Sequence, residues 1–216
     1  MLEKDYLMRM IQQLAIVLAK ILFNKDISNY DLALEEIDDA FKSLLGWDTD
    51  FTTSLTSLEL FEKLELIEGK HWEKCLVAAE LINQEAQVYE LKRGYSPLIT
   101  DLYKKAFLFY LQVIENEQNY NTERCFRNLE YIANILLEED LPVDFKYSLC
   151  KYFELSDQFD RAENIYYELL DEKESGAKEK IKDFYTRLLA RTDAELEAGN
   201  LPRNEILEGQ RHLTKM

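Results

Sequence analysis

Histidine, cysteine and carboxylate side chains are the groups in this sequence that could do chemistry, and their spacing gives little support to a site. His71 and Cys75 are four residues apart, so they share one face of a helix and could bind zinc together. A zinc site needs further ligands, and no nearby residue has a suitable spacing. We therefore expect no metal and no cofactor. The other histidine, His212, lies in a polar segment near the C-terminus, where we expect it to be exposed.

Clustered carboxylates are a second candidate for chemistry, because pairs of them perform acid–base catalysis when a pocket separates their pKa values. The clusters are Glu35, Glu36, Asp38 and Asp39; Glu138 and Glu139; and Asp171 and Glu172. All lie on polar faces or at the ends of predicted helices, which favours solvated surface. The sequence also lacks the GxGxxG, GxxxxGK[ST], GxSxG and HExxH motifs. These observations predict a protein that is not an enzyme.

The charge balance restricts the partners. The chain has 26 basic and 42 acidic residues, a formal net charge of −16. Phosphate backbones and anionic membranes repel such a chain, so we expect neither nucleic acid nor membrane as a partner. Two interpretations of the acidity remain open: solubility, or a preference for basic partners. Three isolated cysteines without a CxxC pair indicate reduced thiols, and the N-terminus does not resemble a signal peptide, so we expect a cytoplasmic location.

The elements that position these groups are all predicted to be helices. Apolar residues recur with helical spacing almost throughout, and no convincing alternation of period two is present. About ten helices are expected, near residues 3–23, 29–45, 54–68, 70–93, 97–116, 122–138, 142–155, 158–173, 177–198 and 202–213. Short links predict antiparallel hairpins. We expect one domain, with a hairpin array over residues 1–176 and polar capping helices over residues 177–216.

Four of the predicted helices share one pattern, in which an early aromatic residue is followed by small or apolar residues at steps of three, four and three. The sets are Tyr30, Ala33, Ile37 and Ala40; Trp72, Cys75, Ala79 and Ile82; Phe126, Leu129, Ala133 and Leu136; and Phe159, Ala162, Tyr166 and Leu169. A ring at the hairpin corner and a small residue one turn later let two helices approach closely, and the later positions can pack on the next hairpin. The pattern therefore predicts stacked hairpins, with an irregular helical bundle as the alternative.

The segment DFKYSLCKYFELSDQFDRAENIYYELL, residues 144–170, resembles the tetratricopeptide repeat family. Leu149 and Cys150 stand at the Leu-Gly pair of that repeat, and Asp157 stands at its turn glycine. Phe153, Phe159, Ala162, Tyr166 and Leu169 occupy further apolar positions, whereas Lys146 replaces the usual tryptophan. The four aromatic starts are 42, 54 and 33 residues apart, against a family period of 34. The other hairpins are therefore degenerate repeats or simple hairpins. The opening MLEKDYLMRMIQQL also looks like the start of a bacterial family known only as a domain of unknown function.

The tetratricopeptide resemblance implies a groove that binds a protein or peptide. Its groove-lining positions fall at Asp144, Tyr147, Lys151 and Glu154. Tyr147 and Lys151 do not match the pair that grips a peptide carboxylate in chaperone-binding members, and Tyr147 has internal packing as its alternative role. We predict a non-catalytic protein- or peptide-binding module. The alternative is a small-molecule or signal-peptide sensor of the same fold, which would have a polar cavity in place of an open groove.

The first helix is also a candidate for self-association. Its apolar face is wide and contains Met8 and Met10; packing against the second helix accounts for most of it, and a spare face could pair with another copy. We therefore also consider a homodimer formed through this helix.

Overall fold

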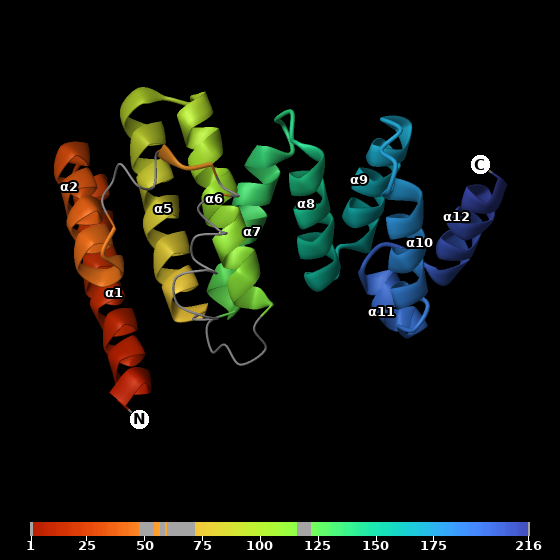
Figure 1. Ribbon diagram of the computed structural model, residues 1–216, viewed down its shortest axis with the longest axis horizontal. Coiled ribbons are helices and arrows are strands. Elements are labelled where there is room, and N and C mark those ends of the chain that lie inside the picture. The colour runs from red at the N-terminus through yellow and green to blue at the C-terminus, as the bar shows by residue number, and fades with distance from the viewer. Residues whose placement is uncertain (1, 48–53, 57–58, 60–71, 116–121, 216) are drawn as a thin grey trace. The chain divides into compact units, whose positions relative to one another are not determined.

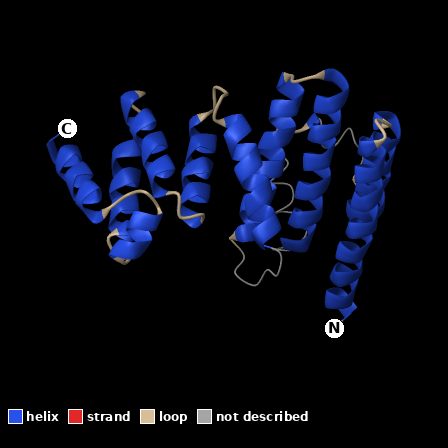
Figure 2. Ribbon diagram, turned by 180° about the vertical axis from the view of Figure 1, so that it is seen from behind, coloured by secondary structure: helices blue, strands red, loops and turns tan. Residues whose placement is uncertain are grey.

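Every regular element among the described residues is helical, as the sequence predicts (Figures 1 and 2). The computed structural model describes residues 2–47, 54–56, 59, 72–115 and 122–215. Its elements are α1 (Leu2–Asp26), α2 (Tyr30–Ala40), the π-helix η1 (Phe41–Leu45), α5 (Trp72–Arg93), α6 (Pro97–Ile114), α7 (Thr122–Leu136), α8 (Val143–Leu155), α9 (Phe159–Asp171), α10 (Ala177–Leu188), α11 (Asp193–Ala198) and α12 (Arg203–Lys215). Most of the predicted helix over residues 54–68, and His71, lie outside the described residues. None of the described helices has the length and apolar character needed to span a bilayer.

Contacts divide the chain into two compact units, residues Met1–Glu138 and Glu139–Met216. The first, unit 1, contains α1 to α7. The second, unit 2, contains α8 to α12, so the C-terminal helices belong with the α8–α9 hairpin. The sequence analysis placed its internal division at residue 176, at the end of that hairpin.

Helix α5 is the centre of unit 1. It packs most extensively on α6, and it also contacts α1, α2 and η1. Its residues from Leu76 to Ala86 are all buried, including the polar ones. Helices α1 and α2 form an antiparallel hairpin beside it, and Gly46, with φ of 70°, ends η1 in the left-handed conformation that glycine adopts at little cost.

The α8–α9 hairpin of unit 2 carries the tetratricopeptide resemblance. The small side chain of Ala162 allows close approach, since the Cys150 Sγ lies 3.7 Å from the Ala162 carbonyl oxygen. Asp157 has φ of 53°, so it adopts the left-handed conformation at the position of the turn glycine. The apolar positions of the resemblance are all buried: Leu149, Phe153, Phe159, Ala162, Tyr166 and Leu169.

The other aromatic helix starts are less deeply placed than Phe159. Tyr30 and Phe126 are half-buried, and the side chain of Trp72 lies outside the described part of the chain. The positions that follow them at steps of three and four are buried, except for half-buried Cys75. The predicted helix faces are therefore confirmed, while the deepest corner ring is the one at Phe159.

The prediction of one helix over residues 177–198 is wrong, because the chain turns between α10 and α11. Thr192 and Glu195 form a capping box, in which each side chain bonds the other residue's backbone N–H. This cap starts a new helix at Asp193. The turn after α11 then returns to the α8–α9 corner, where the Gly199 carbonyl accepts hydrogen bonds from the backbone N–H groups of Phe159 and Asp160 at 3.1 and 3.3 Å. The last helices thus supply acceptors for the unpaired amides at the start of α9.

Candidate functional site

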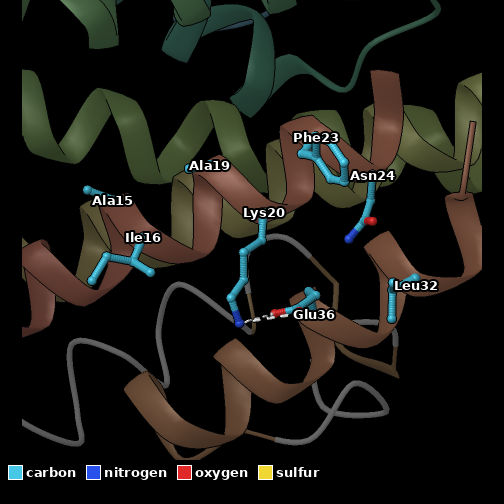
Figure 3. A pocket seen from close by; sticks show the side chains of 8 residues that line it. All are labelled: Ala15, Ile16, Ala19, Lys20, Phe23, Asn24, Leu32 and Glu36. Atoms are coloured by element: carbon cyan, nitrogen blue, oxygen red, sulfur yellow. Dashed lines mark hydrogen bonds and ion pairs between the residues drawn. The ribbon is translucent and has the colours of Figure 1, made fainter. Parts of the chain in front are cut away.

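An open apolar groove between α1 and α2 is the first candidate site (Figure 3). Its volume is about 730 Å³. The lining residues are Ala15, Ile16, Ala19, Lys20, Phe23 and Asn24 from α1, and Leu32 and Glu36 from α2. Lys20 and Glu36 form an ion pair at 3.1 Å across the groove, between Ile16 on one side and Phe23 and Leu32 on the other.

The groove exists because α1 is apolar on opposite faces. One face is buried in unit 1 through Met10, Leu14, Leu18 and Ile21. The other face leaves Ile16 and Phe23 each 62% exposed, and Met8 is 53% exposed. Large apolar side chains that gather on an exposed face often mark an interaction surface. The outer face of α1 is therefore a surface suited to a partner.

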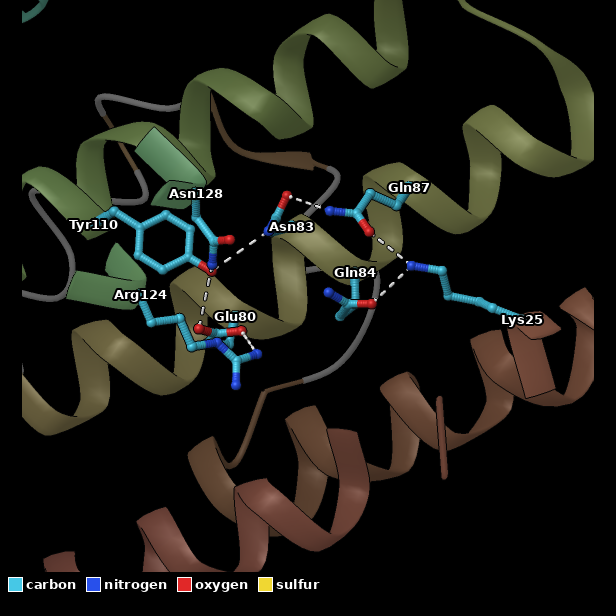
Figure 4. A network of polar contacts seen from close by, with 8 residues as sticks. All are labelled: Lys25, Glu80, Asn83, Gln84, Gln87, Tyr110, Arg124 and Asn128. Atoms are coloured by element: carbon cyan, nitrogen blue, oxygen red, sulfur yellow. Dashed lines mark hydrogen bonds and ion pairs between the residues drawn. The ribbon is translucent and has the colours of Figure 1, made fainter. Parts of the chain in front are cut away.

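A buried row of polar side chains on α5 is the second candidate site (Figure 4). Glu80, Asn83, Gln84 and Gln87 follow steps of three, one and three, so they share one side of the helix. Lys25 of α1 donates to the side-chain oxygens of Gln84 and Gln87 at 2.9 and 2.6 Å. Gln87 in turn donates to the Asn83 side-chain oxygen at 3.2 Å. This end of the row ties α1 to α5.

The other end of the row converges on Glu80 and the Tyr110 hydroxyl. Arg124 of α7 contacts the Glu80 carboxylate at 2.7 Å. The Tyr110 hydroxyl accepts from Asn128 at 2.7 Å and from Asn83 at 3.5 Å, and it hydrogen-bonds to Glu80. Burial raises the pKa of Glu80, and the Arg124 charge opposes that shift. The Tyr110 hydroxyl on α6 and the Arg124 and Asn128 side chains on α7 are bonded to one another or to the row on α5. These bonds tie the three helices together.

Glu85 differs from that row because its charge has no direct partner. The side chain is fully buried, and neither carboxylate oxygen has a hydrogen-bond partner among the residues that the structure describes. Burial, with a smaller contribution from Asp38, raises its pKa to about 7, although the Lys105 charge acts in the opposite direction. Lys105 is itself buried and pairs with Asp101 at 2.5 Å. A buried carboxyl of this kind is neutral at mildly acidic pH and becomes charged at a cost above neutrality.

The four groove positions predicted from the resemblance lie on α8, in unit 2, and two of them are engaged within the chain. Tyr147 donates a hydrogen bond to Glu174 and has the Lys180 amine 3.9 Å from its ring centre. Glu154 pairs with Arg187 of α10 through two contacts of 2.7 Å.

Asp144 and Lys151 of the same face are exposed. The face of α8 thus joins α10 through Tyr147 and Glu154, and it leaves the Asp144 and Lys151 side chains exposed to solvent. Binding of a partner at these four residues stays a prediction.

The other candidates for chemistry lie on the surface or are inert. Five of the eight predicted surface carboxylates are exposed, namely Glu35, Asp39, Glu138, Asp171 and Glu172, whereas Glu36, Asp38 and Glu139 are half-buried. His212 is exposed, as predicted. Cys125 and Cys150 are buried free thiols whose pKa burial raises, to about 12 for Cys125. Within the described ranges, no three His, Cys, Asp or Glu residues gather as metal ligands.

Both unit 1 candidates left signals that the sequence analysis used only in part. The polar row on α5 is visible in the sequence as four polar residues, Glu80, Asn83, Gln84 and Gln87, on one side of the helix. The groove lies on the first helix, which the analysis considered for self-association, but the residues it named there, Met8 and Met10, do not line the groove. Residues Ile16 and Phe23 themselves were missed.

Comparison with known proteins gives a family and nothing more specific. The family described as "Family of unknown function (DUF6483)" matches residues 1–216. No curated protein and no solved structure matches the chain. Because the match spans the whole chain, this protein belongs to the DUF6483 family of unknown function.

Proposed function

We propose that this protein is a non-catalytic binding module, built from tetratricopeptide-like helix hairpins, that docks another protein in the α1–α2 groove. The observation that carries the proposal is the exposure of Ile16 and Phe23 over an open apolar groove. Fully burying a side chain of this size is worth about 1.5–3 kcal/mol. Two such side chains, with Leu32 of α2 beside Phe23, resemble the small group of apolar anchors that dominates many protein interfaces.

The polar row on α5 supports binding by a rigid surface more than sensing of a small molecule. A sensor pocket needs polar groups that await a ligand. In the row, the Lys25 amine and the Tyr110 hydroxyl are already bonded to groups on neighbouring helices. The Lys25 bonds hold α1 against α5 and so fix the α1 side of the groove. A fixed helix loses little conformational entropy when a partner binds.

The α8 face is a second surface within the same proposal. Its exposed residues Asp144 and Lys151 suit a polar peptide segment. Tyr147 and Glu154 already bond to α10 and to the turn before it, so the exposed members of this face are the charged residues Asp144 and Lys151. This surface is therefore less apolar than the α1–α2 groove. The groove is therefore the site at which we expect the main contact.

Photo-crosslinking in the source cells tests this function directly. A benzoylphenylalanine at position 23 is compared with one at position 155, because Leu155 is also an exposed apolar residue, on unit 2. We expect covalent adducts with another protein at position 23 and none at position 155. Equal adducts at both positions, or none at position 23, would show that the groove does not bind a protein.

A further inference from the structure

The acidic residues around the α1–α2 groove are not all balanced by bases. Helix α2 has five acidic residues and no basic one in the sequence YDLALEEIDDA. Glu36, Asp31 and Asp38 pair with Lys20, Lys92 and Lys42 respectively. Glu35 and Asp39 are exposed and form no ion pair with a described residue. Two negative charges on α2 therefore face solvent alone.

These two charges border the groove. Leu32, Glu35 and Asp39 are separated by three and four residues, so Glu35 and Asp39 lie one and two turns beyond the groove-lining Leu32 on the same side of α2. On α1, exposed Asp26 follows Phe23 by three residues, which places it one turn further along the same face. The apolar floor thus has acidic residues on both of its helices. Lys20, the one base among the described residues that line the groove, is already paired with Glu36.

The apolar positions on the groove floor have the spacing of a helix partner. Ile16 and Phe23 are seven residues apart on α1, a distance of about 10 Å along the axis. A helix lying along the groove places its own residues i and i+7 at the same separation. Ala19 lies between these anchors and Ala15 lies next to Ile16, and the small side chains of both leave room for the backbone of an approaching helix.

A second copy of this chain fits the groove poorly. Two copies related by a twofold axis would bring the same surface together, so each copy would place its exposed carboxylates against a surface that also carries unpaired acidic residues. The net charge of −16 adds a general repulsion between copies. The charge pattern favours an occupant whose flanks are positive.

We propose that the groove binds a basic amphipathic helix of a partner protein, whose apolar residues contact Ile16 and Phe23 and whose Lys or Arg residues face Glu35, Asp39 and Asp26. This inference rests on the proposed function and specifies the partner's chemistry. Helix-in-groove recognition supplies the apolar contacts, and the acidic border supplies orientation and speeds association.

Two synthetic helical peptides of about 18 residues, or five turns, test the charge preference. Both carry the same leucines at positions i, i+3 and i+7, and their flanks carry either lysines or glutamates. Binding to the full-length protein is measured by fluorescence anisotropy at roughly 50 and 300 mM salt. We expect the lysine peptide to bind at least about tenfold more tightly than the glutamate peptide, with a smaller difference at high salt.

Two pairs of variants locate the binding. Glu35→Gln with Asp39→Asn removes the border charges, and Glu138→Gln with Asp171→Asn removes two exposed charges elsewhere. Both double variants have the same net charge. We expect the first to weaken binding of the lysine peptide several-fold and the second to leave it unchanged. Ile16→Ser with Phe23→Ser should abolish binding of the lysine peptide.

The outcomes separate this inference from the proposed function. Equal affinity for the two peptides, or equal losses in the two charge variants, overturns the basic helix but leaves a protein-binding groove. Binding that survives Ile16→Ser with Phe23→Ser is non-specific attraction and also overturns the inference. A crosslink from position 23 to a second copy, with a dimer seen by light scattering, replaces the basic helix with self-association. Absence of any adduct at position 23 removes the function itself.

Discussion

Replacing Glu85 by Gln is expected to change how the stability of unit 1 depends on pH. Burial without a hydrogen-bond partner raises the pKa of Glu85 from 4.5 to about 7. Between these two values the unfolded chain has lost the proton and the folded chain still holds it. The free energy of unfolding therefore falls as pH rises through this range, and the loss is complete above about pH 7. At roughly 1.4 kcal/mol per pKa unit, the total loss is about 3 kcal/mol.

Glutamine has nearly the same shape and never becomes charged, so Glu85→Gln removes this loss. The stability of the variant relative to the wild type should therefore rise by about 3 kcal/mol between roughly pH 4.5 and pH 8, whatever its relative stability at pH 4.5. Urea unfolding followed by tryptophan fluorescence measures the effect in unit 1, because both tryptophans, Trp47 and Trp72, belong to that unit.

The difference between the two pH profiles is the informative quantity, since a buried amide has its own cost at every pH. Glu138→Gln serves as the control, because Glu138 is an exposed carboxylate in the same unit and should leave the profile unchanged. Parallel profiles for the wild type and Glu85→Gln between about pH 5 and pH 8 would refute the argument. They would mean that Glu85 ionises in the folded protein much as it does in the unfolded chain.

Three further predictions concern unit 2, and each is checked by urea unfolding followed by circular dichroism. Gly199→Ala should lower the free energy of unfolding by about 1–3 kcal/mol, because a Cβ there would lie 2.3 Å from the Phe159 ring. Gly176→Ala should lower it much less, because the nearest atom there belongs to a flexible glutamate side chain. Equal losses in the two variants would contradict the packing of Gly199 against Phe159. Thr192→Ala should cost about 1 kcal/mol by removing the capping box, and Thr192→Ser should recover most of it. Lys146→Met should lower the free energy of unfolding by about 1 kcal/mol, because the partner carboxylates Glu168 and Glu172 are half-exposed and can be hydrated without the lysine. A loss of several kcal/mol would show that the two ion pairs stabilise unit 2 more than exposed pairs do.

Most helices could be predicted from the sequence, because an amphipathic helix records its buried face in the spacing of its apolar residues. The steps of Phe159, Ala162, Tyr166 and Leu169 identify a face that is buried in the structure. The break between α10 and α11 was missed, because it depends on the Thr192–Glu195 cap within a stretch that is otherwise continuous with a helix.

The candidate sites were less predictable than the helices that carry them. The α8 residues were chosen by position in a repeat, and spacing alone does not show that Arg187 reaches Glu154 or that Glu174 accepts from Tyr147. The α1–α2 groove needs one more fact, namely which of two apolar faces of α1 is covered by a neighbour. Ile16 and Met10 look alike in the sequence, yet one is 62% exposed and the other 2%.

The sequence by itself determined an acidic, all-helical chain and the inward faces of most of its helices, because helical periodicity and charge are properties of neighbouring residues. Only the tertiary structure decided that Glu85 is buried without a partner and that the outer face of α1 stays open. Both facts depend on which helices pack together across long separations in the chain, and contacts of that kind leave no local pattern in the sequence.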